Sequence, residues 1–127
     1  MSAVKMVGLP GFGSLAPAES EAIDAAEKEL GLAFAKEYRD VLGLYGSICT
    51  DDHEMIGLGP SKRLNVVAVT EELRALYAAL GDDLYVIEDL GIDGLLICQD
   101  SAGVIYELAP NGKPRKIAAT LLEYLSE

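Results

Sequence analysis

The chain has 127 residues, half of which are hydrophobic, so it is large enough for one packed domain and too apolar for a disordered chain. Its formal net charge of −11 disfavours direct nucleic-acid binding, because contacts to phosphates require Lys and Arg side chains. No apolar run approaches the ~20 residues of a membrane-spanning helix, and we expect neither a membrane segment nor a signal peptide.

Residues 1–18 are expected to form an N-terminal arm that precedes a single domain over residues 19–127. The arm contains the glycine-rich run GLPGFG at residues 8–13. This run lacks the Lys-Ser or Lys-Thr pair of a phosphate-binding loop and follows no convincing strand, so we interpret it as extended chain.

Residues 23–48 predict two amphipathic helices that are separated by a Gly-Leu turn. Ile23, Ala26 and Leu30 recur at helical spacing and share one face. A glycine follows at position 31, where helices often end in a left-handed residue. The second helix repeats this design, with four apolar positions before a glycine at position 46: Tyr38, Val41, Leu42 and Tyr45. Each helix can therefore bury one stripe and expose its charged face.

The middle of the chain is predicted to contain short strands and one further helix. Residues 48–50 and 55–58 are the strand candidates. Residues 65–80 are predicted as a helix with four inward side chains: Leu73, Leu76, Tyr77 and Leu80. The valines at positions 66, 67 and 69 fit a helix poorly, because β-branched side chains lose rotamer freedom there.

Residues 84–108 predict three strands joined by tight turns, at residues 84–87, 95–98 and 104–108. Between the last two strands, Asp and Gly suit a hairpin loop. A final helix is predicted to carry Ile117, Leu121 and Leu125 on its inner face. Helices first and a strand meander later indicate one α+β domain. Its expected core includes Leu30, Leu42, Tyr45, Ile87, Leu96, Ile97, Ile105 and Leu121.

Few residues have the types and spacing of a catalytic or metal site. His53, the only histidine, lies in the acidic segment DDHE at residues 51–54, which we interpret as a solvated loop and, as the alternative, a metal site. We expect no catalytic residue, no metal ligand and no cofactor, because no motif frames a nucleophile for this histidine. Cys49 and Cys98 lie in apolar segments, so we expect two buried free thiols and a cytoplasmic protein.

Acidic residues outnumber basic ones most strongly around the predicted strands. Residues 71–93 contain seven acidic residues against one basic residue, Arg74. We interpret these carboxylates as charged turns that meet a basic protein partner, and not as an acid–base pair. The predicted partner-binding residues are Asp51, Asp52, Glu54, Asp82, Asp83, Glu88, Asp89 and Asp93. An acidic surface that only maintains solubility is the alternative.

The helix pair carries the patterns I-x-x-A-E-x-x-L-G at residues 23–31 and Y-x-x-x-L-x-x-Y-G at residues 38–46. The later strands carry Gly94 and the run GVIYE at residues 103–107. Over about residues 19–126 these patterns resemble the SUKH superfamily, which includes many bacterial toxin-immunity proteins and a fungal regulator of cell-wall synthesis. Two features depart from the family pattern: Phe34-Ala35 replaces a usual Leu-Pro, and the chain has no tryptophan. The subfamily is therefore left open.

The resemblance implies a central, mostly antiparallel sheet with about four helices around it, and no enzymatic activity. It also implies an immunity protein, a monomer or weak dimer, that binds a cognate basic toxin domain such as a nuclease and neutralises it. A regulatory or adaptor module of the same fold is the main alternative. A small enzyme or ligand carrier is the third.

Overall fold

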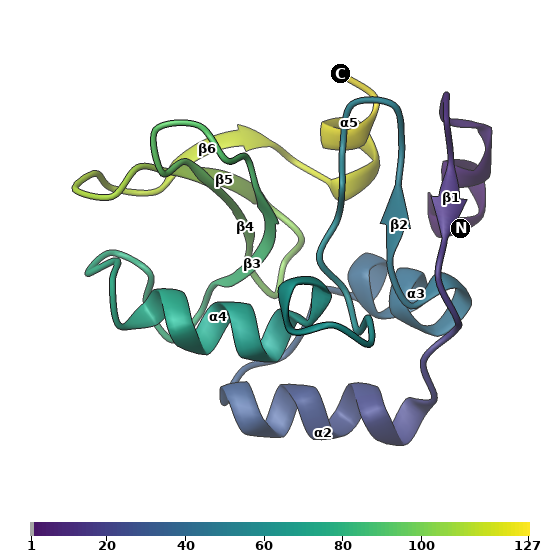
Figure 1. The fold of residues 1–127 in the computed structure, drawn as a ribbon, viewed down its shortest axis with the longest axis horizontal. Helices are drawn as coiled ribbons and strands as arrows, with labels where there is room; N and C mark the ends of the chain where they lie inside the picture. The colour runs from purple at the N-terminus through teal and green to yellow at the C-terminus, as the bar shows by residue number, and fades with distance from the viewer. Residues whose placement is uncertain (1) are drawn as a thin grey trace.

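Two antiparallel sheets lie among short helices in the computed structural model, which describes residues 2–127 (Figure 1). The larger sheet has the strand order β3-β4-β5-β6, and its strands are β3 (Tyr85–Asp89), β4 (Leu96–Gln99), β5 (Ile105–Leu108) and β6 (Arg115–Ala118). The smaller sheet pairs β1 (Gly13–Ser14) with β2 (Ile48–Cys49). The predicted α+β class is confirmed.

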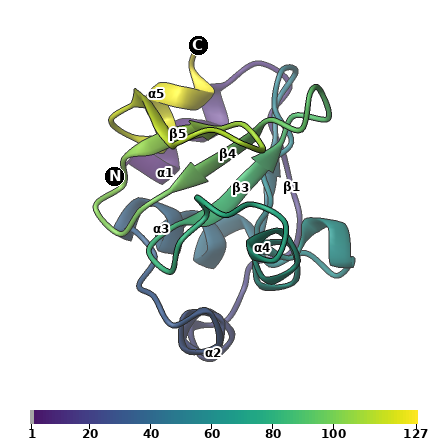
Figure 2. The same cartoon turned by 90° about the vertical axis from the view of Figure 1, so that its left-hand side faces the viewer.

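The helices lie around the larger sheet and not all on one side of it (Figures 1 and 2). The α-helices are α1 (Ser2–Lys5), α2 (Ser20–Leu30), α3 (Lys36–Tyr45), α4 (Val66–Arg74) and α5 (Leu121–Leu125), and two 3-10 turns are η1 (Met6–Gly8) and η2 (Lys62–Leu64). Figures 1 and 2 both show α3 and α4 next to the sheet and α2 as the outermost helix. The outermost helix, α2, therefore packs mainly on α3 and α4.

The predicted helix pair is confirmed as α2 and α3. Ile23, Ala26 and Leu30 are buried along one face of α2, and Gly31 ends the helix with a φ of 70°. That left-handed conformation is cheap only for glycine, which explains the residue at this position. In α3 the apolar stripe is likewise buried, except that Tyr45 is half-buried.

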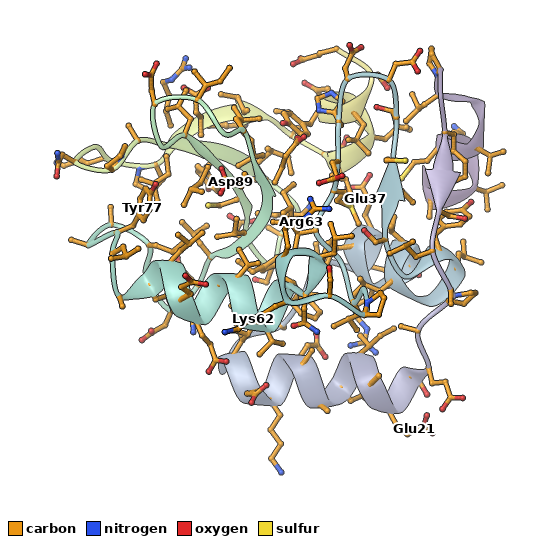
Figure 3. All side chains as sticks on the ribbon, viewed as in Figure 1. Glu21, Glu37, Lys62, Arg63, Tyr77 and Asp89 are labelled. Atoms are coloured by element: carbon orange, nitrogen blue, oxygen red, sulfur yellow. The ribbon has the colours of Figure 1, made fainter. Side chains whose placement is uncertain are left out.

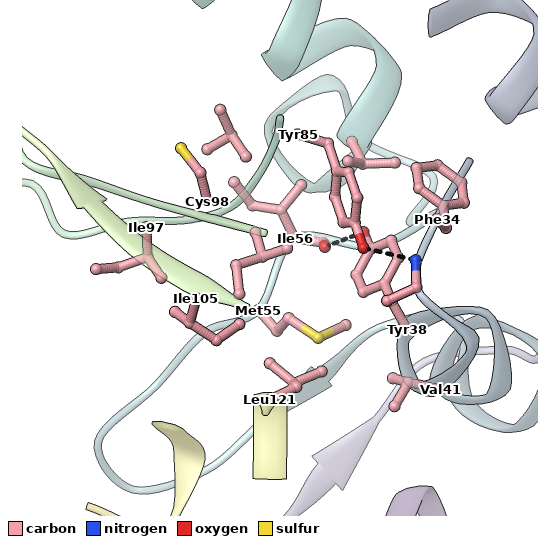
Figure 4. Packing of buried hydrophobic residues seen from close by; sticks show 14 of the residues in the cluster. Phe34, Tyr38, Val41, Met55, Ile56, Tyr85, Ile97, Cys98, Ile105 and Leu121 are labelled. Atoms are coloured by element: carbon pink, nitrogen blue, oxygen red, sulfur yellow. Dashed lines mark hydrogen bonds between the residues drawn. The ribbon is translucent and has the colours of Figure 1, made fainter. Parts of the chain in front are cut away.

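Three aromatic rings join α3 to the larger sheet in the core (Figure 4). Phe34, Tyr38 and Tyr85 have ring centroids 4.8–5.1 Å apart. The Tyr38 hydroxyl donates to the Ile56 carbonyl at 2.6 Å, and the Tyr85 hydroxyl accepts from the Ala35 backbone N–H at 3.0 Å. Both polar tips are thus satisfied inside an apolar cluster. All the predicted core residues except the half-buried Tyr45 are buried.

The helix predicted over residues 65–80 is wrong in its second half, because α4 ends at Arg74. Its start is set by Asn65, whose side chain accepts from the N–H groups of Val67 and Ala68. The β-branched residues that fit a helix poorly are tolerated since Val66 and Val67 are buried in the core. Beyond the helix the chain forms turns, and Leu76 is exposed instead of inward.

Two further predictions are corrected at the strand level. Ile117 and its neighbour at position 118 belong to β6, which pairs with β5, and only Leu121–Leu125 is helical. Thr120 caps that helix by accepting from the Glu123 N–H at 3.0 Å. Residues 55–58 form no named strand and make only isolated bridges to Asn65. In each case hydrogen bonds to distant segments decide the local structure.

The N-terminal segment differs from the extended arm that we expected. Residues 2–8 are helical, and Ala3 and Met6 are fully buried. The Tyr45 hydroxyl on α3 donates to the Ala3 carbonyl at 3.0 Å. Burial of these side chains makes the segment part of the folded core.

Candidate partner-binding surface

The eight predicted carboxylates lie at three places in the fold instead of on one continuous face. Asp51, Asp52 and Glu54 lie in the loop after β2, and Asp82 and Asp83 lie in the turn before β3. The remaining three lie at the end of β3 and in the turn that follows: Glu88, Asp89 and Asp93. Since β3 spans five residues, or about 17 Å, the second and third groups lie at opposite ends of that strand.

Glu88 is not a surface residue, because its side chain is buried among three partners. The Tyr124 hydroxyl donates to its Oε1 at 2.5 Å, the Glu54 backbone N–H donates to its Oε2 at 3.0 Å, and His53 Nδ1 lies 3.1 Å from Oε1. Burial, together with this bond to the carboxylate, raises the pKa of Tyr124 well above its ordinary value, so the hydroxyl remains a donor. Glu88 therefore anchors the 51–54 loop and α5 to β3.

His53 packs within the same cluster and is not a solvated loop residue. Its side chain is 12% exposed, and its ring lies 4.7 Å from the Tyr124 ring. Its Nε2 is buried and has no hydrogen-bond partner in the described structure. Within residues 2–127 no three His, Cys, Asp or Glu side chains are grouped as a metal site would require. The histidine thus helps to hold the acidic loop in place.

Six of the eight predicted carboxylates are exposed and form no ion pair with the residues that the structure describes: Asp51, Asp52, Asp82, Asp83, Asp89 and Asp93. Glu54 is exposed too, but it pairs with Arg63. Arg74 forms no ion pair with a described carboxylate, and its guanidinium donates instead to the backbone carbonyls of Leu30 and Asp82. The negative charge of these turns is therefore largely uncompensated.

Asp89 has a different environment from the other five. It lines a cleft of about 340 Å³ between η2, α4 and the sheet, and Lys62, Arg63 and Glu72 also line this cleft. Figure 3 shows Asp89 on the sheet and Arg63 on η2 turned toward the same space above α4. Sequence reasoning missed these cations because they precede Asp89 by more than 25 residues. Arg63 pairs with Glu54, so Lys62 is the cation of this cleft that forms no ion pair with the described residues.

A groove of about 1030 Å³ lies between α2 and α4. Small apolar side chains line much of it, among them Ala22 and Ala25 from α2 and Ala68 from α4. Ala22 and Ala25 lie three positions apart in α2, a spacing in the sequence that the helix prediction did not use. The groove offers apolar contact and no set of convergent catalytic groups.

The two cysteines differ from the expectation that both are buried. Cys98 is buried in β4, and burial raises the pKa of its thiol to about 12. Cys49 is exposed in β2, which is an edge of the two-stranded sheet. Both thiols are free, so no disulfide constrains the site.

The helix pair, the meander and the glycine at the end of each helix are the features on which the family resemblance rested. A family model described as SUKH_5, SMI1-KNR4 cell-wall, matches residues 5–127. The chain belongs to the SUKH family. No curated protein matches this SUKH domain in sequence.

The residues that this SUKH domain shares with the family pattern hold the fold together. Gly46 ends α3 with a φ of 72°, and a Cβ atom there would collide with the Ala16 carbonyl. Gly31 has a φ of 70° at the end of α2. Across residues 2–127 no helix has the length and apolarity to cross a bilayer.

Proposed function

We propose that this SUKH domain is a non-enzymatic immunity protein that binds a basic toxin domain and neutralises it. SUKH domains are commonly immunity proteins and are generally non-catalytic. The observation that carries the proposal is the set of six exposed carboxylates without ion pairs in the described structure. Binding of a basic partner reduces the electrostatic repulsion among these carboxylates, whereas binding of a neutral or acidic partner does not.

Charge of this kind acts mainly on encounter. A negative patch that faces a positive one raises the association rate, and salt screens the effect over a Debye length of about 10 Å at 0.1 M. The carboxylates at both ends of β3 stand on turns held by a rigid sheet, where binding residues are commonly displayed. Glu88 is buried and holds the acidic loop in place, so we no longer count it among the residues that contact the partner.

The test first asks whether a toxin domain is encoded beside the gene for this protein, and an inactive variant of that domain is then the binding probe. Asp82, Asp83, Asp89 and Asp93 are changed together to Lys, and association is measured by stopped flow or surface plasmon resonance. We expect the association rate to fall by about tenfold or more at low salt, and by less at high salt. A separate Asp51→Lys, Asp52→Lys variant tests the loop after β2.

A matched control reverses four exposed carboxylates elsewhere: Glu19, Glu29, Glu71 and Glu123. It changes the net charge by the same amount, so a purely global effect slows both variants equally. The proposed surface is contradicted if the two variants associate equally slowly. It is also contradicted if the variant with four Lys residues around β3 associates at the unsubstituted rate.

The second candidate function is a regulatory or adaptor module of the same fold. Immunity requires that co-expression of this protein protect cells from the active toxin domain. Tight binding to a non-toxic partner, together with no protection, favours the adaptor. The family match is compatible with both functions.

A further inference from the structure

The two most exposed large hydrophobic side chains of the described chain are Leu76, at 69%, and Ile92, at 65%. Both lie in connecting segments: Leu76 follows α4, and Ile92 lies in the turn between β3 and β4. Single exposed apolar residues are normal on protein surfaces. Leu76 and Ile92 differ from the other exposed hydrophobic residues because the segments that carry them lie at the same end of the fold.

A hydrogen bond joins the two segments directly. Tyr77, the neighbour of Leu76, donates from its hydroxyl to the Gly94 carbonyl at 2.5 Å, and Gly94 lies two residues after Ile92. Figure 3 shows Tyr77 in the loop beyond α4, at the end of the molecule where the β5–β6 loop also lies. Leu76 and Ile92 therefore stand within one interface footprint, since ~800 Å² per partner is a patch about 30 Å across.

Gly94 shows that the loops at this end are packed closely. It has a φ of +70°, and a Cβ atom there would lie 2.8 Å from Pro110 Cγ and 3.1 Å from the Tyr77 hydroxyl. Three connecting segments thus converge on one glycine. Loops held in this way lose little conformational entropy when a partner binds, which favours affinity.

Acidic residues surround the two apolar side chains along the chain. Asp82 and Asp83 follow in the segment that carries Leu76, and Asp93 is next to Ile92. All three are exposed and lack ion pairs within residues 2–127. The β5–β6 loop and the start of β6 supply two cations without ion pairs in the described chain, Lys113 and Lys116, whereas Arg115 pairs with Glu107. A second copy of this chain would bring the same carboxylates against themselves. Charge therefore selects a basic partner over self-association.

We propose that Leu76 and Ile92 are the apolar anchors of the partner interface, and that they enter apolar recesses on a basic protein surface. This inference rests on the proposed function and deepens it, because interfaces combine an apolar centre with a polar rim. The carboxylates set the association rate, and the anchors set the lifetime of the complex.

The experiment measures binding of the same inactive toxin domain to a Leu76→Ser, Ile92→Ser variant. We expect the dissociation rate to rise by about tenfold or more, while the association rate and its salt dependence change by less than about twofold. A Val4→Ser, Val7→Ser variant is the matched control, because these side chains are 57% and 56% exposed on the N-terminal helical segment. A Leu76→Ala, Ile92→Ala variant repeats the test with less polar side chains.

The outcomes separate the two proposals. If the unsubstituted protein binds and both anchor variants dissociate at its rate, the anchor inference is overturned and the proposed function stands. If the unsubstituted protein does not bind the toxin domain, both are overturned. Sedimentation of the free protein adds a third reading: a dimer that the anchor substitutions dissolve would assign this surface to a second copy and overturn the inference.

Discussion

The Glu88 carboxylate joins three segments that are far apart in the sequence. Its partners are 34–36 residues away: His53 and Glu54 lie in the loop after β2, and Tyr124 lies in α5. A buried carboxylate is costly unless it is hydrogen-bonded, and here both oxygens accept bonds. One residue thus fixes the acidic loop, the last helix and the strand to one another.

At the residue scale, Glu88→Gln should lower the free energy of unfolding by about 2–4 kcal/mol, because the amide NH2 would replace one of the two oxygens that accept from the Tyr124 hydroxyl and the Glu54 N–H. One buried donor would then be unsatisfied. Urea unfolding followed by circular dichroism measures the change. The neighbouring Asp89→Asn is the control and should change stability by less than about 0.5 kcal/mol, since Asp89 is exposed. Equal effects of the two substitutions would show that the hydrogen bonds of Glu88 do not stabilise the fold.

At the element scale, α4 shows how a capping residue and distant contacts define a helix. Asn65 accepts from two backbone N–H groups at the start, at 3.0 and 3.1 Å. Within the helix, the Thr70 hydroxyl accepts from the Val86 N–H in β3 at 3.1 Å. At the far end, Arg74 donates to the last carbonyl of α2. The helix is thereby tied to the sheet and to α2, with the groove beside it.

Asn65→Ala should destabilise the protein by about 1 kcal/mol, within the 0.5–2 kcal/mol that loss of an N-cap costs. Asn65→Asp should retain most of the stability, because its oxygen can still accept from the first N–H groups. Thermal or urea unfolding of the three proteins provides the comparison. An alanine variant as stable as the original would mean that the cap contributes nothing to α4.

At the scale of the whole molecule, the N-terminal helical segment completes the core. Met6 is fully buried and Val7, next to it, is 56% exposed, so the segment has an inner and an outer side. α1 packs against α3, and Figure 2 shows the two helices on the same side of the domain. A domain of this size depends on each large buried side chain.

Met6→Ala should therefore cost about 2–5 kcal/mol through lost burial and the cavity that remains. Val7→Ala, its neighbour, should change the free energy of unfolding by less than about 0.5 kcal/mol. Chemical denaturation distinguishes them. If the two substitutions have the same small effect, residues 2–8 behave as an arm and not as part of the core.

Local patterns in the sequence determined α2, α3 and the strands at residues 85–108 because each of these segments buries its own periodic stripe. Ile23, Ala26 and Leu30 predict a helix from their spacing alone, and the run at residues 96–98 predicts a strand buried on both faces. The glycine at position 31 marks a helix end for a purely local reason, its left-handed backbone. The same helix and glycine patterns pointed to the family, and the composition of the turns showed that they are acidic.

The tertiary structure alone decided the features that depend on distant contacts. Glu88 and Asp89 are adjacent and look alike in the sequence, yet one is buried by His53 and Tyr124 and the other lines a cleft with Lys62. Local propensity cannot distinguish them, because the hydrogen bonds and charges that do so come from residues more than 25 positions away. Contacts over shorter separations decide other features: β6 forms by pairing with β5, and the Tyr77 hydroxyl joins the segment after α4 to the turn between β3 and β4.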